Sequence, residues 1–267
     1  MRMGVSKSLR YPLAACSMTK KECRAIELPL RKAALPALGF PPSFPLHLVH
    51  APPSSLGLGI PSLWNEQGID HINTLLRFGC TSTTHSTGQL LHGSLANLKI
   101  ELGLPGNPTV HPYARLAMCT TRCTFHTTWE FCHDNRLVLK DCLPSLTAPR
   151  INEQCIMEVF LQSSFSAKEL HMFNVCRLWC RSIFVSDLVS GDGTHLLPIP
   201  LRTPARQPRT VHTHIDWPTA GRPSQHFWPQ WRLALTCCLV LPHNQYGRLK
   251  KPLKEWMIEP GPAWADY

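Results

Sequence analysis

The stretch "SAKELHMFNVCRLWC", residues 166–180, carries the strongest helix signal in the chain. Ser166 and Glu169 have the spacing of a capping box, in which each side chain accepts a hydrogen bond from the backbone amide of the other residue. A helix is therefore predicted to begin there and to continue to Ile183, with "SGDG" (190–193) as the turn that follows. Because apolar residues cover most of its circumference, we expect this helix to be largely buried. These residues are Leu170, Phe173, Val175, Cys176, Leu178, Trp179 and Ile183.

A second capping box is formed by Thr19 and Glu22, and it predicts a helix that runs on to residue 38. Pro29 and Pro36 fall inside this segment, and we expect them to kink or divide the helix. Gly39 and the proline cluster at 41–45 should end it. The Pro and Gly density of residues 46–63 then predicts an extended, turn-rich connector.

The remaining periodic segments complete a mainly α fold, an irregular helical assembly with Pro-rich connectors and no internal repeat. Residues 90–102 give the best amphipathic pattern, ending at Gly103. A loop is predicted at 104–113, and a solvated Pro-rich and Arg-rich linker at 196–224. Further helices are predicted from Asn65 or Glu66 to Gly79, in part of 114–140, at 151–161 with Ile156, Val159 and Phe160 inward, and at 227–240 with Trp228, Trp231, Leu235 and Leu239.

The net charge of +10 over 267 residues is unevenly distributed. Residues 1–50 hold eight Lys and Arg against two acidic residues, and residues 196–254 hold nine against one. The intervening residues 51–195 are nearly neutral. Two basic flanks indicate a polyanionic partner, and nucleic acid is the partner that we expect. An Arg excess that reflects base composition alone is the alternative.

The amino-acid composition leaves open the alternative that the chain is not the product of a functional gene. Only 16% of the residues are charged, while the chain has 25 Pro, 12 Cys, 14 His and 8 Trp. This skew departs from the average composition of globular proteins. A translated non-coding frame or a decayed open reading frame would produce the same skew, so that reading stays open.

The cysteines and the apolar runs bear on the compartment. Twelve cysteines without a signal peptide predict reduced thiols in the cytoplasm or nucleus. "LAAC" (13–16) imitates a lipoprotein cleavage site, but the hydrophobic run that must precede such a site is absent. The most apolar run, 233–241, is too short to cross a bilayer, so no transmembrane segment and no membrane partner are predicted.

Several familiar catalytic patterns are missing from the sequence. Gly57 and Gly59 suggest a phosphate-binding loop, but no third glycine and no lysine follow them. There is no Gly-x-Ser-x-Gly segment, and no Cys–His nucleophile pair can be singled out among fourteen histidines. The seven aspartates are never adjacent, as the metal-binding palm of a polymerase would require. The sequence therefore predicts no catalytic residue and no cofactor.

Cys119, Cys123, Cys132 and His133 are weak candidates for a zinc site, because thiolate and imidazole are the ligands that zinc prefers. Their spacing matches no common zinc motif, and buried or incidental cysteines are the alternative. Cys176 and Cys180 lie among apolar neighbours and are interpreted as core thiols.

Seven segments, read in order, resemble the region of a LINE-like retrotransposon polyprotein that lies just downstream of the reverse transcriptase palm. The second of them shows a Pro, then Gly-Leu-Gly, then a Gln-Gly helix, and the resemblance makes these glycines part of a connector that passes closely between packed helices. The segments are "KSLRYPLAACSMTKKECRAIELPLRKAALPALGF" (7–40), "FPLHLVHAPPSSLGLGIPSLWNEQGIDHINTLLRFG" (44–79), "TGQLLHGSLANLKIELGLPG" (87–106), "TTWEFCHDNRLVLKD" (127–141), 151–194, "WPTAGRPSQHFWPQWRLAL" (217–235) and "GRLKKPLKEWM" (247–257).

The resemblance implies a division of the chain and a partner. It makes residues 1–45 a thumb-like helical segment and 46–195 a helical post-polymerase region, followed by a basic linker at 196–225 and a C-terminal helix and tail at 226–267. The thumb would hold an RNA template or an RNA/DNA hybrid beside the upstream polymerase segment of the same polyprotein. The phosphate contacts are expected at Lys20, Lys21, Arg24, Arg31 and Lys32, with Arg202, Arg206 and Arg209 as further candidates.

The expected function is thus that of a C-terminal fragment of a retroelement reverse transcriptase polyprotein, associated with nucleic acid and catalytically inactive alone. None of the palm aspartates of that family can be placed on this chain. The segments 116–131 and 176–188 depart from the family pattern by their additional Cys, Thr and Trp residues. The alternatives are a small nucleic-acid-binding or zinc-binding module and a non-functional decayed frame.

Overall fold

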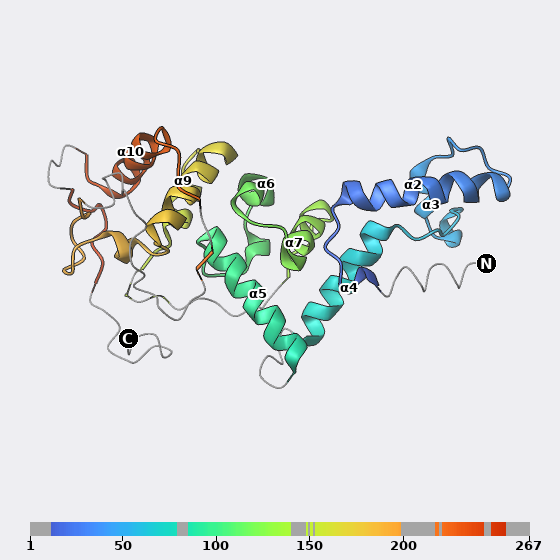
Figure 1. The fold of residues 1–267 in the computed structure, drawn as a ribbon, viewed down its shortest axis with the longest axis horizontal. Helices are drawn as coiled ribbons and strands as arrows, with labels where there is room; N and C mark the ends of the chain where they lie inside the picture. Colours follow the sequence, from blue (N-terminus) through green and yellow to red (C-terminus); the bar gives the residue numbers. More distant parts are fainter. Residues whose placement is uncertain are drawn as a thin grey trace. The chain divides into compact units, whose positions relative to one another are not determined.

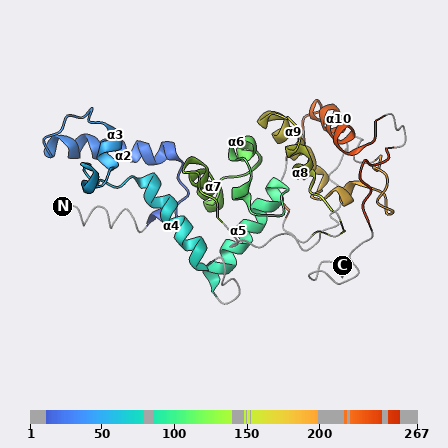
Figure 2. The ribbon, with the colours of Figure 1, turned by 180° about the vertical axis from the view of Figure 1, so that it is seen from behind.

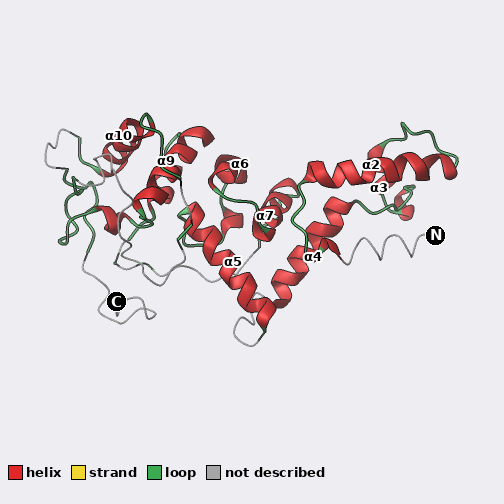
Figure 3. Cartoon of the chain, viewed as in Figure 1, coloured by secondary structure: helices red, strands yellow, loops and turns green. Residues whose placement is uncertain are grey.

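The structure, a computed structural model, describes residues 12–78, 85–139, 148, 150–151, 153–198, 217–218, 221–242 and 247–254. These residues are mainly helical and contain no sheet, only isolated β-bridges, which confirms the expected fold class. The helices can be followed along the chain in Figures 1 and 2, and Figure 3 separates helices from loops. Among the described residues, every helix is too short or too polar to cross a membrane.

The chain forms two compact units that interleave in sequence. Unit 1 comprises Met1–Leu91 and Arg122–Val138, and unit 2 comprises His92–Thr121 and Leu139–Tyr267. This division differs from the four consecutive segments expected, because α7 (Thr124–Asp134) packs against α4 (Leu63–Phe78) of unit 1. The boundary at 91/92 falls within α5, Ser86–Leu102.

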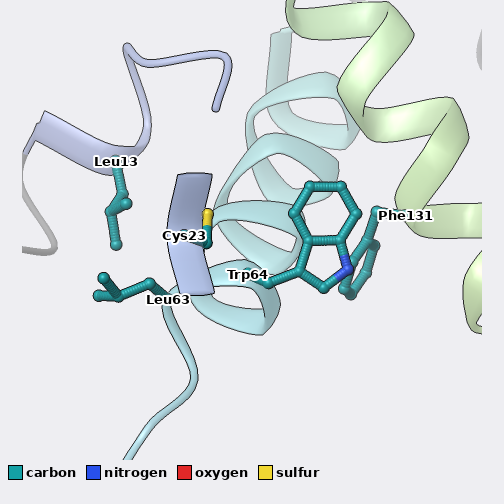
Figure 4. Close-up of a cluster of buried hydrophobic side chains, with 5 residues drawn as sticks. All are labelled: Leu13, Cys23, Leu63, Trp64 and Phe131. Atoms are coloured by element: carbon teal, nitrogen blue, oxygen red, sulfur yellow. The ribbon is translucent and has the colours of Figure 1, made fainter. Parts of the chain in front are cut away.

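Unit 1 is built around α4, which packs against both α7 and α2 (Lys20–Ala37). The side chains at the centre of this packing come from all three helices and from the segment before α2, as Figure 4 shows. They are Leu13, Cys23, Leu63, Trp64 and Phe131. Trp64 and Phe131 meet edge to face, with ring centroids 5.9 Å apart, a favourable aromatic arrangement.

A reciprocal pair of hydrogen bonds fixes the start of α2 against α4. The buried Gln67 side chain accepts from the Met18 amide at 3.1 Å and donates to the Met18 carbonyl at 2.9 Å. One side chain thus satisfies both backbone groups of the residue that precedes the Thr19 cap. The predicted capping box is present at Thr19, and α2 continues through Pro29 and Pro36 without division.

The segment between α2 and α4 is more ordered than the sequence suggested. It begins with α3 (Leu46–His50), where the expectation of an extended connector was wrong, and it continues with a 3₁₀ turn at Pro53–Ser55 and non-helical residues at 57–62, in agreement with the turn-rich connector predicted. The chain then folds back on α3, since the Leu58 amide donates to the Leu48 carbonyl at 2.9 Å. A Cβ atom on Gly57 would lie 2.0 Å from the Ala51 carbonyl oxygen, so a glycine is required at this close approach.

Unit 2 is organised by α9, Ala167–Cys180, which packs against α6 (Tyr113–Leu116), α8 (Ile156–Leu161) and α10 (Phe227–Leu239). Aromatic rings join three of these helices. The ring centroid of Phe160 lies 5.1 Å from that of Phe173 and 5.7 Å from that of Trp231. The residues predicted to point inward from α8 are buried, and so are the apolar residues named for α10: Ile156, Val159 and Phe160, and Trp228, Trp231, Leu235 and Leu239.

The predicted capping box of α9 is present, but the helix ends at Cys180 and not at Ile183. Arg181 takes a left-handed conformation with φ of 56°, which stops the helix. Ile183 and Phe184 then run beside Cys155, with an antiparallel bridge between Cys155 and Phe184. That pairing also delays the start of α8 to residue 156, since Cys155 is extended.

The other helices depart from prediction mainly at their ends. α4 begins two residues before the earlier of its predicted starts, and α5 begins at Ser86. The predicted loop at 104–113 includes a 3₁₀ turn at Pro108–Val110, and 114–140 is helical in part, as expected. "SGDG" (190–193) is a turn between the bridged residues Val189 and Leu196, ten residues after α9 has ended.

Arg177 forms the polar centre of unit 2. Its guanidinium is fully buried and donates to the Ile100 carbonyl at 2.6 Å, to the Glu101 carbonyl at 2.8 Å and to the Ser182 carbonyl at 2.8 Å. Nε donates to Asn174 at 2.9 Å. The bonds to Ile100 and Glu101 reach two carbonyls in the last turn of α5, where the helix dipole is negative. Burial lowers the pKa of Arg177 to about 10, so the group remains charged at neutral pH.

Candidate nucleic-acid interface

Local hydrogen bonds hold the N-terminus of α2. The Thr19 hydroxyl accepts from the Glu22 amide at 3.2 Å, and the Glu22 carboxylate accepts from the Thr19 amide at 2.7 Å. Arg122 of unit 1 also donates to Glu22, with 3.0 Å between Nη1 and Oε1. Hydrogen bonds from Arg122 and Thr19 lower the pKa of Glu22 to about 2. The first turn of α2 is therefore anchored to the segment that precedes α7.

The inner side of α2 is held by Cys23, which is fully buried in the cluster of Figure 4. Burial raises the pKa of this thiol to about 11, so it is neutral at physiological pH and acts as a small apolar side chain. Successive residues of a helix differ by roughly 100° in direction, so residues at 20, 21, 24, 31 and 32 fall within about 120° of the circumference. The five candidate phosphate-binding residues thus share one side of α2.

These five residues differ in their surroundings. Lys21, Arg24 and Lys32 are exposed and make no ion pair with any other described residue. The Lys20 ammonium instead binds Asp134 of α7, with 2.6 Å between Nζ and Oδ2. Arg31 is half-buried, and its Nε atom has no hydrogen-bond partner in the described part of the chain. Arg202, Arg206 and Arg209 lie outside the described residues.

A polar pocket of about 200 Å³ lies beside this side of α2. Its wall combines cationic, anionic, amide and apolar side chains, which come from α2, α3, α4 and α7 and from residues next to α4 and α7. The lining residues are Lys20, Arg24, Glu27, Leu46, His50, Ser62, Trp64, Asn65, Asp134 and Asn135. Lys20 and Arg24 therefore belong both to the pocket and to the basic side of α2.

Glu27 joins three elements at the floor of the pocket. Its Oε1 atom accepts from the Leu63 amide at 2.5 Å and from the Ser62 hydroxyl at 3.1 Å. A carboxylate in this place caps the N-terminus of α4, where unpaired amides and the helix dipole favour negative charge. The other carboxylate oxygen lies 4.0 Å from Nε2 of His50.

The His50 ring is oriented by a backbone carbonyl. Nδ1 lies 2.8 Å from the Ile60 carbonyl oxygen, which can only accept, so Nδ1 carries the proton. The ring thereby ties the last residue of α3 to the connector that leads into α4.

The pocket wall holds two cationic and two anionic side chains, and all but Arg24 are held by hydrogen bonds to other described residues. Lys20 and Asp134 neutralise each other, and Glu27 is occupied by the Leu63 amide and the Ser62 hydroxyl. Arg24 makes no hydrogen bond or ion pair with any residue that the structure describes. A guanidinium without an internal partner can bind a phosphate or carboxylate through two parallel hydrogen bonds. The pocket can therefore accept one anionic group.

The four weak zinc candidates do not gather. Cys119 ends the 3₁₀ turn at 117–119 in unit 2, whereas Cys123, Cys132 and His133 belong to unit 1. Within the described ranges, no three His, Cys, Asp or Glu residues are placed to hold a metal ion. Burial raises the pKa of Cys119 to about 12, which disfavours the thiolate that zinc binds.

Apart from Lys20 and Arg24, the pocket residues were not identified as site residues from the sequence. Glu27 carried the clearest signal, because it falls at the i+7 position of the stripe formed by Lys20, Arg24 and Arg31. His50, Asn65 and Asp134 carried none, since they join α2 only through the packing of α3, α4 and α7. No known protein-family model, curated protein or solved structure matches this chain.

Proposed function

We propose that this chain is part of a retroelement reverse transcriptase polyprotein and that it binds nucleic acid along α2 without catalysing a reaction alone. The order of the resembling segments supports the polyprotein origin. The absence of adjacent aspartates from the sequence supports the lack of polymerase chemistry. RNA template or RNA/DNA hybrid is the ligand that this origin favours.

The proposal rests on one observation: three cationic side chains on the basic side of α2 are exposed and make no ion pair with another described residue. Lys21, Arg24 and Lys32 are exposed on a helix whose opposite side is fixed by Cys23 and whose start is fixed by Glu22. Their charges have no partner among the described residues, so binding a phosphate breaks no existing ion pair. Phosphate contacts of this kind position a strand without reading its sequence.

Fluorescence anisotropy with labelled single-stranded RNA tests the proposal over a series of salt concentrations. The logarithm of the association constant should fall linearly with the logarithm of the salt concentration, by about 0.7 per phosphate contact. Replacing Lys21, Arg24 and Lys32 together by alanine should lower the magnitude of this slope by about 2. An RNA/DNA hybrid measured in parallel shows which form is preferred.

A variant with the same loss of charge elsewhere provides the control. Lys168, Arg222 and Lys251 are exposed residues of unit 2, and none belongs to the α2 surface. Their combined replacement by alanine should leave the salt slope unchanged. Equal weakening by both triple variants would reduce the binding to an effect of net charge, and no binding at low salt would refute the proposal.

The polyprotein origin has a separate test in the coding DNA. An aromatic-x-Asp-Asp motif in frame upstream of the Met1 codon would place a polymerase palm before this chain. Unrelated coding sequence upstream would contradict the polyprotein origin, whatever the result of the binding measurements.

A further inference from the structure

The pocket beside α2 has the size and chemistry of a site for one nucleobase. Its 200 Å³ is less than the volume of pockets that bind drug-sized ligands. Trp64 and Leu46 supply apolar wall, and the polar groups surround them. A single planar base fits such a volume, whereas a dinucleotide does not.

We propose that this pocket takes one unstacked base from a strand bound along α2 and prefers a base with an exocyclic amine to uracil. The inference rests on the proposed function, since the same helix supplies the phosphate contacts. Arg24 lies in the pocket wall and on the basic side of α2, so it binds the phosphate at the point where the base enters. Recognition of splayed, unstacked bases is common in proteins that bind single-stranded RNA.

The preference for an amine follows from the balance of donors and acceptors. Glu27 and Asp134 use only one carboxylate oxygen each, Oε1 and Oδ2, in their hydrogen bonds to described residues, which leaves the other oxygen of each for a ligand. The Asn135 Nδ2 atom already donates to the Phe131 carbonyl at 2.9 Å, which leaves its amide oxygen for a ligand. These acceptors match the amino groups of adenine and cytosine, whereas uracil offers carbonyl oxygens at its edge.

Asn65 is the residue through which the base is read. It lies exposed in the first turn of α4, and its amide makes no side-chain hydrogen bond to another described residue. An asparagine amide offers a donor and an acceptor together, the pattern that pairs with the edge of adenine. Its replacement by alanine changes no charge, so it separates base reading from phosphate binding.

The test compares oligoadenylate, oligocytidylate and oligouridylate of about ten nucleotides, a length within the site sizes of single-strand binders. The wild-type chain should bind the first two at least about fivefold more tightly than oligouridylate. Asn65→Ala should remove that difference by lowering the affinities for oligoadenylate and oligocytidylate to that for oligouridylate. Asn73→Ala, at an exposed position of the same helix outside the pocket, should change neither.

Each other result counts against the inference in a recognisable way. If the wild-type chain bound all three oligomers with equal affinity and kept the salt dependence, the proposal of a base-selective pocket would be refuted. The proposed nucleic-acid binding along α2 would still stand. Uniform weakening by Asn65→Ala would assign that residue a structural role, and thermal melts of the variants show whether the fold is kept. AMP that bound as tightly as oligoadenylate would overturn the assignment to a strand.

Discussion

Arg177 occupies the space that a side chain on Gly103 would need. A Cβ atom on Gly103 would lie 2.7 Å from both Cζ and Nε of Arg177. Gly103 also has a φ of +66°, the left-handed conformation that ends α5 at little cost only for glycine. The same residue therefore ends α5 and admits the guanidinium that satisfies the last carbonyls of the helix.

Gly103→Ala should lower the free energy of unfolding by about 2 kcal/mol or more, because left-handed strain and a clash with Arg177 act together. Urea denaturation monitored by circular dichroism measures the change. Gly93→Ala, in the same α5 helix, meets no atom within 4 Å and should stabilise by up to about 1 kcal/mol. Similar effects of the two variants would contradict this account of Gly103.

Arg177→Met should lower the free energy of unfolding by about 3 kcal/mol or more, since it leaves the Ser182 carbonyl without its donor and removes one hydrogen bond each from the Ile100 and Glu101 carbonyls. Arg177→Lys should be nearly as damaging, because one ammonium cannot reproduce the planar fork of the guanidinium. Arg222→Met at an exposed position should shift stability by less than about 0.5 kcal/mol. A mild effect of Arg177→Met in denaturant melts would show that water replaces these bonds.

Lys99→Met should raise the free energy of unfolding, in contrast to Arg177→Met. The Lys99 ammonium is buried without a hydrogen-bond partner among the described residues, and burial lowers its pKa from 10.5 to about 8. The unfolded chain therefore binds more protons between pH 8 and 10.5. Stability rises with pH across that window, and the full penalty remains below it. Removing the charge should stabilise by about 1–3 kcal/mol at neutral pH.

Unfolding of Lys99→Met and the wild-type chain in urea at neutral pH and near pH 10 tests this explanation. The difference in free energy of unfolding between Lys99→Met and the wild-type chain should be smaller near pH 10, where the wild-type lysine is neutral. Lys168→Met, at an exposed position of α9, should show no such dependence on pH. If the variant were more stable than the wild-type chain by the same amount at both pH values, better packing of the apolar methionine side chain at this position, and not the removal of a charge, would be the cause.

Acid should destabilise the fold through His71, which is buried, and His111, which is half-buried. Burial lowers the pKa of His71 and of His111 below the ordinary value of 6.5. The unfolded chain then takes up protons that the folded chain does not, so stability falls as the pH drops below about 6.5. His71→Gln should reduce the loss measured by thermal melts between neutral and mildly acidic pH. His47→Gln, at an exposed position, should preserve the acid sensitivity of the wild-type chain.

Local patterns predicted the starts of α2 and α9 correctly, because a capping box needs only residues three apart. The ends were less predictable. The apolar pattern of α9 continued past Cys180 to Ile183, although Arg181 turns the chain there and Ile183 packs beside Cys155. Periodicity shows that a residue is buried, but it does not show whether a helix or a bridge buries it.

The residues of the candidate interface also fall into two groups, those that the sequence predicted and those that it did not. The basic residues of α2 could be read from the sequence, since their common side follows from helical spacing alone. The anionic and amide residues of the pocket could not, because Asp134 and Glu27 are 107 residues apart and meet only when α7 packs against α4.

The sequence by itself determined the helical class, the capped helix starts and the basic side of α2, because these depend on contacts within one or two turns. Tertiary structure alone decided that α7 joins the unit formed by the first 91 residues, and that Arg177 meets carbonyls 76 and 77 positions away. A buried guanidinium and a pocket lined by several helices both need complementary groups from distant segments. Only the packing of the apolar faces brings those groups together.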